Sequence, residues 1–348
     1  MHLHQLGWNN FFEASLAPHS TRGLIPGRVF LASHEIYRLA TAEGELRAEL
    51  TGSLRYRAES ALDLPAVGDW VAVRAFPGDD GGVIDAILPR ASALVRRAAG
   101  TAGQPQLIAA NVDTVFIVTS ANQDLNPRRL ERYLAFVTEG GAKAVIVLSK
   151  ADLVSDPRTL AAELQRVAPD TPILVTSSRT EEGISDLAPF LGLGQTVALV
   201  GSSGVGKSSL VNRLLGEERQ AVQAIREADD RGKHATTHRE LFALPGGALL
   251  LDTPGLRELG LWDAGEGLAA VFDDIAALAT SCRFGDCKHQ GEPGCAVREA
   301  VDHGTLDAGR LESYHKLERE QRYRADRDAG GAAYAERKRW KAIHSRAR

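Results

Sequence analysis

The sequence predicts a multidomain α/β protein, because three segments of different character follow one another along its 348 residues. Short runs with alternating apolar residues, broken by glycine and proline, fill the first part of the chain. Continuous apolar segments that alternate with helical ones follow from about residue 111, and strand signals stop after about residue 262. We therefore expect three domains, at residues 1–100, 101–262 and 263–348.

The composition is that of an ordinary globular protein, with 44% hydrophobic and 25% charged residues. No apolar stretch approaches the ~18 residues that span a bilayer. The N-terminus lacks the basic start and long apolar core of a signal peptide. We therefore expect a cytoplasmic monomer with no membrane partner, and the net charge of −4 gives no global sign of nucleic-acid binding.

The first domain contains four short runs with partial period-2 alternation, and no convincing long helix interrupts them. About five strands of this kind predict a small barrel, of which the OB-fold is the commonest architecture. The pattern alone does not exclude another small barrel. The runs lie at residues 28–31, 45–50, 69–74 and 82–87.

The second domain has the alternation of strands and helices that is typical of a mostly parallel sheet with helices on both faces. Asn126 and Pro127 provide a helix cap and a proline at the first helical position. The expected strands lie at 114–120, 144–149, 173–176, 196–200 and 248–252, and the expected helices at 127–139, 157–168, 182–190 and 209–215.

Residues 201–208 read GSSGVGKS, which is a complete G-x-x-x-x-G-K-[ST] phosphate loop between an apolar strand and a helix. The glycines let backbone N–H groups approach phosphates, the lysine reaches the β- and γ-phosphates, and the final hydroxyl ligates Mg²⁺. We expect nucleotide contacts from Gly201, Ser202, Ser203, Gly204, Val205, Gly206, Lys207, Ser208 and Ser209.

A guanine-reading sequence, Ser149-Lys150-Ala151-Asp152, lies about fifty residues before this loop, whereas in an ordinary GTPase it follows the loop. The order predicts a circularly permuted P-loop GTPase domain that binds GTP and GDP. The Asp152 carboxylate can accept two hydrogen bonds from guanine that adenine cannot offer. Ser149 replaces the usual asparagine and is shorter, so weaker affinity is one expectation. Ser177 and Ser178 are placed to contact the guanine O6.

Two further segments are expected to complete the Mg²⁺ and γ-phosphate contacts. Asp252 ends an apolar strand and can hold Mg²⁺ through water, and the Gly255 N–H can then sense the γ-phosphate. A threonine hydroxyl from the segment before this strand would complete the Mg²⁺ shell only when the γ-phosphate is present. Thr237 or Thr236 fits this role, and the sequence does not choose between them.

Leu256 occupies the position at which a Ras-like enzyme has its water-orienting glutamine. The attacking water therefore needs another guide, and His234 is a candidate. The alternative is that His234 is simply an exposed loop residue. Together with Lys207 and Thr237, His234 forms the catalytic set that we expect, and basal hydrolysis should be slow unless a partner completes the site.

All three cysteines of the chain fall within fourteen residues of the third domain and flank a histidine. An odd number of cysteines argues against a disulfide framework. Three thiolates and an imidazole form a closed tetrahedral set that suits structural zinc rather than catalytic zinc. The sequence therefore predicts a C-terminal helical zinc-binding domain with one Zn²⁺ per chain, held by Cys282, Cys287, His289 and Cys295.

The end of the chain is basic, because residues 310–348 contain twelve Lys and Arg against six Asp and Glu. Such a tail can contact a phosphate backbone in a salt-dependent manner. The alternative is a solvated, partly disordered helix.

Taken together, these motifs resemble the RsgA/YjeQ family of ribosome small-subunit-dependent GTPases, which are circularly permuted. The resemblance implies an N-terminal OB-fold, a permuted GTPase domain and a zinc domain. It also implies that the partners are the small ribosomal subunit and its rRNA late in maturation, with hydrolysis stimulated by that subunit and followed by release. Ser149 for asparagine and Ala235 for the common threonine depart from the family pattern. The resemblance rests on residues 67–71, 149–152, 201–209, 232–237 and 252–261, and on the zinc ligands with residues 292–295.

Two other classes of function remain open from the motifs alone. An ATP-dependent kinase could use the same phosphate loop, although Asp152 and the Asp252-Thr253-Pro254-Gly255 segment argue against it. A nucleotide-regulated RNA-binding module with little turnover could use the barrel and the zinc domain. Competition between nucleotides, and turnover in the presence of ribosomal subunits, would separate these classes.

Overall fold

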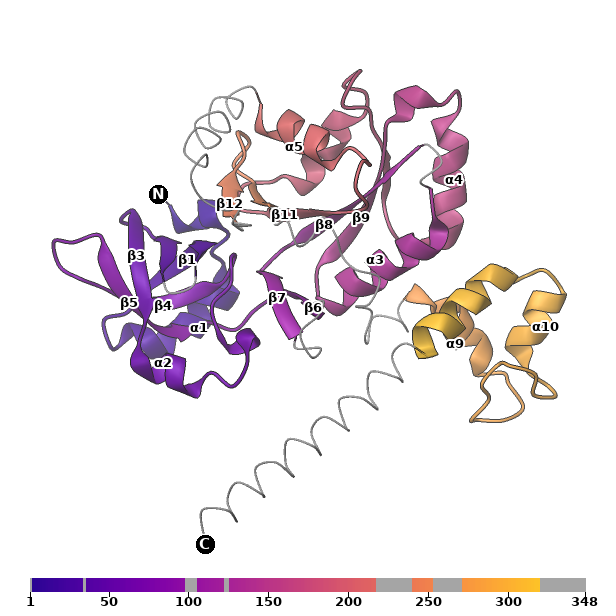
Figure 1. Ribbon diagram of the computed structural model, residues 1–348, viewed down its shortest axis with the longest axis horizontal. Coiled ribbons are helices and arrows are strands. Elements are labelled where there is room, and N and C mark those ends of the chain that lie inside the picture. The colour runs from indigo at the N-terminus through magenta and orange to yellow at the C-terminus, as the bar shows by residue number, and fades with distance from the viewer. Residues whose placement is uncertain are drawn as a thin grey trace, which may run out of the picture. The chain divides into compact units, whose positions relative to one another are not determined.

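The computed structural model describes residues 2–33, 36–97, 105–121, 125–216, 240–252 and 271–319 (Figure 1). The chain divides into two compact units, Met1–Asp263 and Ala264–Arg348. The first unit holds the barrel and the nucleotide sheet, and the second holds the cysteine cluster.

Five strands close into a barrel in the order β1-β2-β3-β5-β4, with β4 pairing back onto β1. The strand β3 runs parallel to β5, and the other neighbours are antiparallel. This five-stranded barrel confirms the OB-fold prediction. The strands are β1 (Ile25–Ala32), β2 (Tyr37–Ala40), β3 (Glu45–Leu50), β4 (Trp70–Ala75) and β5 (Gly81–Ile87).

The barrel carries helical elements that the sequence pattern did not predict. Helix α1 (Asn10–Ser20) is capped by Asn9, and its Phe12 and Leu16 pack on the barrel residue Trp70. Its apolar residues are not confined to one face, since Phe12 is buried and Phe11 is exposed, so the helical period is weak, and Pro18 lies inside it. The other elements are α2 (Gly52–Arg57) and the 3₁₀ helices η1 (Leu3–Leu6) and η2 (Ala61–Asp63).

The nucleotide sheet follows in the order β10-β9-β8-β11-β13-β12, and all of its strands are parallel except β12. The mostly parallel sheet that the apolar runs predicted is therefore confirmed. An antiparallel pair, β6 (Ala93–Arg97) and β7 (Pro105–Ala110), links it to the barrel segment of the chain. The sheet strands are β8 (Thr114–Ser120), β9 (Lys143–Ser149), β10 (Ile173–Val175), β11 (Thr196–Val200), β12 (Glu240–Ala243) and β13 (Leu249–Asp252).

Helices cover both faces of this sheet, with α3 (Pro127–Glu139) and α5 (Lys207–Leu215) on opposite sides in Figure 1. The Asn126 side chain caps α3 as predicted, by accepting a hydrogen bond from the N–H of Arg129. Helix α4 (Pro157–Val167) lies beside the edge strand β10. The segment near 182–190 is a 3₁₀ helix, η4 (Ile184–Phe190), rather than an α-helix, and it contains Pro189.

A buried arginine joins the barrel to the nucleotide sheet. The Arg28 guanidinium, on β1, donates hydrogen bonds to the carbonyl of Leu6, to the carbonyl of Asn111 at 3.1 Å and to Thr196 Oγ1 at 2.8 Å. Burial lowers the pKa of Arg28 to about 10, so the side chain is still cationic near neutrality. Because Thr196 begins β11, this side chain helps to fix the barrel against the strand that leads to the phosphate loop. The antiparallel pairing of β1 with β12, through Leu31 and Glu240, is a second connection between the barrel and the sheet.

The segment before β4 approaches the end of β7 so closely that position 68 requires a glycine. Gly68 has φ +92°, and a Cβ there would lie 2.1 Å from the carbonyl oxygen of Ala110. Asn111 adds a polar contact at this point, because its side-chain amide donates to the carbonyl of Gly68 at 3.0 Å.

The second unit is helical, with α9 (Asp273–Ala279), α10 (Ala296–Asp302) and helical residues from 308 to 319. Arg310 ties these segments together by donating to the Asp274 carboxylate at 2.7 and 2.9 Å. Phe272 packs against Tyr314 with 5.7 Å between ring centroids. Throughout the ranges that the structure covers, no helix is both long and apolar enough to cross a membrane.

We predict that Arg28→Met costs about 3–5 kcal/mol of unfolding free energy, because three buried acceptors lose a charged donor. Urea unfolding followed by circular dichroism measures the effect. Arg22→Met is the control, since Arg22 forms an exposed ion pair with Asp85 that should contribute under about 1 kcal/mol. Equal destabilisation by the two variants would contradict the role assigned to Arg28.

Candidate nucleotide and metal sites

The phosphate loop lies between β11 and α5, as its motif predicts, and it rests directly on the neighbouring strand β8. Gly201 has φ +144°, and a Cβ there would lie 2.2 Å from the carbonyl oxygen of Val118. Only glycine fits this position. Val205 is buried under the loop, whereas Ser203 and Ser208 are exposed. The loop therefore has a fixed base on the sheet and an accessible outer side.

Carbonyl oxygens of the phosphate loop accept hydrogen bonds from a lysine of the same motif. Lys207 is buried and donates through Nζ to the carbonyls of Gly201 at 2.7 Å and Ser202 at 2.5 Å. In phosphate loops the N–H groups bind the anion, so the carbonyls need other partners. These contacts supply such partners and hold the loop in a single conformation.

The guanine-reading sequence contacts the phosphate loop although fifty residues separate the two in the chain. The Ser149 hydroxyl lies 3.1 Å from the carbonyl of Thr119 and also contacts the carbonyl of Val205, and it donates to these oxygens. Lys150 donates through Nζ to the carbonyl of Gly204 at 2.6 Å. The serine therefore contacts and braces the loop, although it is shorter than the asparagine that is usual at this position.

Asp152 lies at the base-reading end of this segment with its carboxylate already oriented. The Ser177 hydroxyl donates to Asp152 Oδ1 at 2.5 Å, and Arg179 Nε donates to Oδ2 at 2.7 Å. Hydrogen bonds from Ser177, which has the larger effect, and from Arg179 lower the pKa of Asp152. Ser178 is adjacent, and its carbonyl accepts a hydrogen bond from Arg213 at 2.9 Å. The structure thus brings together Ser177, Ser178 and Asp152, and it adds Arg179, which no motif had indicated.

Several predicted residues lie outside the described part of the chain. These are His234, Thr236, Thr237 and Gly255. The backbone of Asp252 is described as the last residue of β13, where it pairs with Glu240. Ser209 lies in the first turns of α5, exposed like Ser208. The described residues are therefore those predicted to read the base and to bind the phosphates, whereas most of those predicted to act in hydrolysis lie outside the described ranges.

The four predicted zinc ligands converge in the second unit. Their ligand atoms all lie within 4.8 Å of one another. The His289 Nδ1 atom is 3.6 Å from Cys282 Sγ and 3.5 Å from Cys295 Sγ. A tetrahedral zinc with Zn–S bonds of about 2.3 Å separates its sulfurs by about 3.8 Å, and the Cys282 and Cys295 sulfurs are 4.0 Å apart. The cluster is compatible with zinc in both chemistry and size.

The surroundings of the cluster hold the ligands in place. Desolvation raises the pKa of Cys282, but hydrogen bonds from the backbone N–H groups of Val297 and Ala296 and from the Cys287 and Cys295 thiols together lower that pKa overall. His315 donates through Nε2 to the carbonyl of His289 at 3.2 Å. The first effect favours the thiolate, which is the form of cysteine that binds a metal, and the second fixes the backbone of a predicted ligand.

Glu292 organises the loop between two of the ligands, Cys287 and Cys295. Its carboxylate accepts hydrogen bonds from the backbone N–H groups of Lys288 and Gln290, each at 2.8 Å, and of Gly291 at 3.0 Å. Hydrogen bonds from the backbone, including its own N–H, lower the pKa of Glu292 to about 2. The loop is therefore fixed by an ionised side chain at neutral pH.

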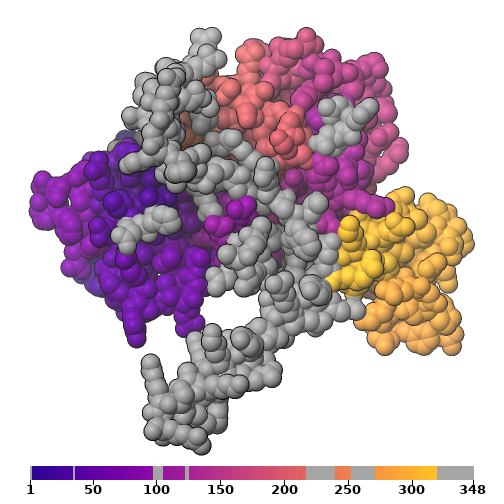
Figure 2. Space-filling model, in the orientation of Figure 1, coloured from indigo at the N-terminus to yellow at the C-terminus, as the bar shows by residue number. Residues whose placement is uncertain are grey.

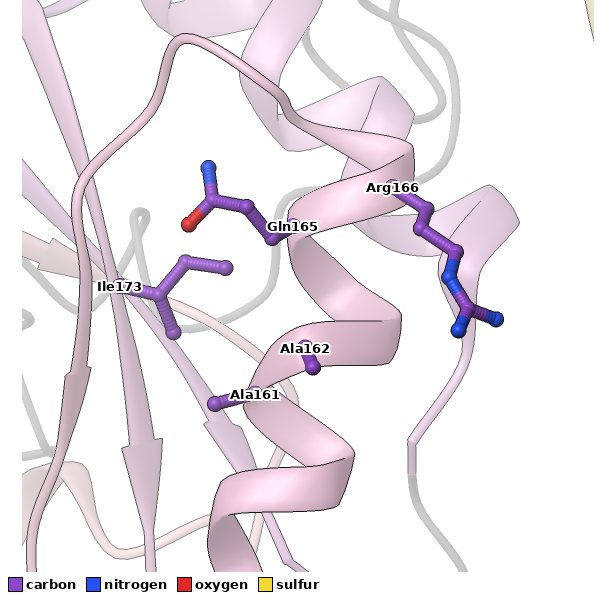
Figure 3. Close-up of a pocket in the computed structure, with 5 residues that line it drawn as sticks. All are labelled: Ala161, Ala162, Gln165, Arg166 and Ile173. Atoms are coloured by element: carbon purple, nitrogen blue, oxygen red, sulfur yellow. The ribbon is translucent and has the colours of Figure 1, made fainter.

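A separate hollow of about 470 Å³ lies between α4 and β10 (Figure 3). It is lined by Ala161, Ala162, Gln165, Arg166 and Ile173 and contains none of the predicted site residues. The Gln165 amide donates to the carbonyls of Ala168 and Pro169, which close the end of α4. Its polar group thus serves the helix end, and the hollow offers no converging groups for a ligand.

Comparison with known proteins agrees with this geometry. The sequence profile of the family described as RsgA GTPase matches residues 87–262. The chain is 50% identical to the "Small ribosomal subunit biogenesis GTPase RsgA" of Opitutus terrae over 99% of this chain and 96% of that protein. The chain belongs to the RsgA family of GTPases. A protein of the same name from Syntrophotalea carbinolica is 47% identical and covers 91% of this chain and 88% of its own length.

Two solved structures share the fold of this RsgA-family chain. YjeQ from Thermotoga maritima gives a TM-score of 0.63 at 29% identity, over 84% of this chain and 97% of that one. YloQ, which is described as a circularly permuted GTPase, gives a TM-score of 0.63 at 25% identity, over 86% of this chain and 96% of that one. The shared fold and the family membership show that this chain is a circularly permuted GTPase.

We predict that Ser149→Ala weakens binding of both GTP and GDP about 5- to 10-fold, because one bracing hydrogen bond contributes about 1 kcal/mol. Titration with fluorescent guanine nucleotides measures both affinities. Ser149→Thr retains the hydroxyl and should bind close to the wild-type affinity. Unchanged affinity in the alanine variant would show that Ser149 does not brace the loop.

We predict that wild-type protein binds one zinc ion per chain and that Cys295→Ser loses it. Metal binding contributes on the order of 10 kcal/mol to such small segments, so residues 271–319 should become sensitive to protease while the first unit still binds GTP. Atomic emission and limited proteolysis measure these two effects. Ser281→Ala changes a neighbouring exposed residue and should retain the metal. Full zinc content in Cys295→Ser would contradict the ligand assignment.

Proposed function

We propose that this GTPase binds the small ribosomal subunit and its rRNA and acts in late maturation of that subunit. It hydrolyses GTP to GDP and phosphate, and the subunit stimulates turnover and the release that follows. The observation that carries the proposal is the contact of Ser149 and Lys150 with the phosphate loop, which unites two motifs in permuted order. The names of the relatives, which are small ribosomal subunit biogenesis GTPases, support the choice of partner.

The nucleotide site is assigned as follows. Asp152 accepts the guanine N1–H and N2–H₂, supported by Ser177 and Arg179. Lys207 neutralises the β- and γ-phosphates, and Ser208 ligates Mg²⁺. Further nucleotide contacts come from Ala151, Ser178 and the rest of the loop from Gly201 to Ser209.

The hydrolytic roles are assigned to the segment before β13 and to the end of that strand. Asp252 holds Mg²⁺ through water, and Thr237 or Thr236 completes its shell. The Gly255 N–H senses the γ-phosphate, and His234 guides the attacking water. Zinc at Cys282, Cys287, His289 and Cys295 has a structural role, because four protein ligands leave no position for a substrate.

The barrel provides a candidate contact for RNA at α2, which lies at the lower end of the barrel in Figure 1. Tyr56 is 91% exposed, and its neighbours Arg55 and Arg57 are exposed as well. Unpaired bases stack on such aromatic rings, while arginines contact the phosphate backbone. Figure 2 shows the outer surface of the barrel in indigo and purple. The protein acts as a cytoplasmic monomer in this account.

The test is GTP turnover by zinc-loaded protein with and without purified small ribosomal subunits, with ATP as the control nucleotide. We expect slow basal turnover, at least a tenfold stimulation by the subunit and no turnover of ATP. Tyr56→Ala should reduce the stimulation, because one stacked base contributes about 1–3 kcal/mol, while Tyr56→Phe retains it.

The basal rate provides the internal control, since Tyr56 lies in the barrel and outside the nucleotide site. Turnover that does not respond to small subunits would contradict the assigned partner. ATP turnover at the same rate as GTP turnover would contradict the assigned substrate. An unchanged stimulation in Tyr56→Ala would exclude the α2 surface as the RNA contact.

A further inference from the structure

The phosphate loop has a second basic side chain against it, which no sequence motif includes. Arg129, in the first turn of α3, donates through Nη1 to the hydroxyl of Ser202. The contact follows from topology, because β8 and β11 are parallel neighbours whose carboxyl ends lie together. Helix α3 follows β8 and the loop follows β11, so the start of α3 lies next to the loop.

Two cations converge on one residue of the loop. Lys207 Nζ donates to the carbonyl of Ser202 at 2.5 Å, and Arg129 donates to its side chain. Lys207 is buried and Arg129 is half-buried, so water screens their mutual repulsion incompletely. Like charges that are held this close favour an anion beside them. The lysine of such a loop is the group that reaches the β- and γ-phosphates.

The charged residues in the first turn of α3 also favour an anion at this place. This 13-residue helix has no acidic residue in its first turn, where it carries Arg128 and Arg129 instead. The helix dipole favours acidic side chains at this end and disfavours basic ones. The dipole alone therefore does not favour arginines at these positions, whereas an anion bound beside them would.

We propose that Arg129 is a second fixed cation for the terminal phosphates of bound GTP, acting beside Lys207 and held in place by Ser202. The proposal rests on the proposed binding of GTP at the phosphate loop. A guanidinium is a planar, permanently charged fork that matches phosphate oxygens. Because the γ-phosphate adds negative charge, Arg129 should favour GTP over GDP and stabilise the charge that develops during hydrolysis.

The test compares Arg129→Ala with Arg129→Lys and with the matched control Arg128→Ala, which removes an exposed arginine from the same turn. Affinities for GDP and for a non-hydrolysable GTP analogue are measured by fluorescence, together with basal GTP turnover. We expect Arg129→Ala to weaken the GTP analogue about tenfold and GDP less than about threefold. Arg129→Lys should recover part of the GTP affinity, and Arg128→Ala should match the wild type.

Ser202→Ala removes the hydroxyl that holds the guanidinium. Ser202→Ala should also lower the affinity for the GTP analogue. The double variant should lose little more affinity than Arg129→Ala alone. Equal losses for GDP and the GTP analogue in Arg129→Ala would overturn the proposal, since Arg129 would then only support the loop. Unchanged affinities would overturn it as well. Wild-type protein that fails to bind either nucleotide would instead contradict the proposed GTP site.

Discussion

The buried charge of Arg28 is the constraint on which the arrangement of the first unit depends. A guanidinium removed from water is tolerated only when hydrogen bonds compensate for its burial. Nη1 and Nη2 of Arg28 both reach acceptors, whereas its buried Nε has no hydrogen-bond partner among the described residues. The three acceptors are the carbonyl of Leu6 in the N-terminal segment, the carbonyl of Asn111 shortly before β8, and the hydroxyl of Thr196, the first residue of β11. All three must be in place together, so the barrel cannot shift without disturbing the strand that leads to the phosphate loop.

The permuted order of the motifs has little effect on the site because a parallel sheet gathers its functional loops at one edge. The strands β8, β9 and β11 are neighbours, and each presents its carboxyl end at the same edge. Ser149 is the last residue of β9, the phosphate loop follows β11, and Arg129 lies in the helix after β8. Their contacts depend on strand order in the sheet and not on order in the chain.

The sequence predicts the features that are encoded locally. Continuous apolar runs predicted the strands of the nucleotide sheet, Asn126 predicted the start of α3, and the cysteine spacing predicted the metal cluster. Features that depend on distant partners were missed. Helix α1 has a weak apolar period and gains its stability from packing on Trp70. Arg28 acquires its role from contacts with residues that lie 22 to 168 positions away in the sequence. Arg129 acquires its role from a contact with a residue 73 positions away.

The central claim is that the barrel and the nucleotide sheet form one cooperative unit. Native-state hydrogen exchange tests it most directly, by comparing amides of the barrel strand β4 with amides of the sheet strand β8 over a range of denaturant concentrations. The account predicts that the slowest amides of both strands share one free energy of opening. Barrel amides that open at a clearly lower free energy, while the sheet stays protected, would contradict it.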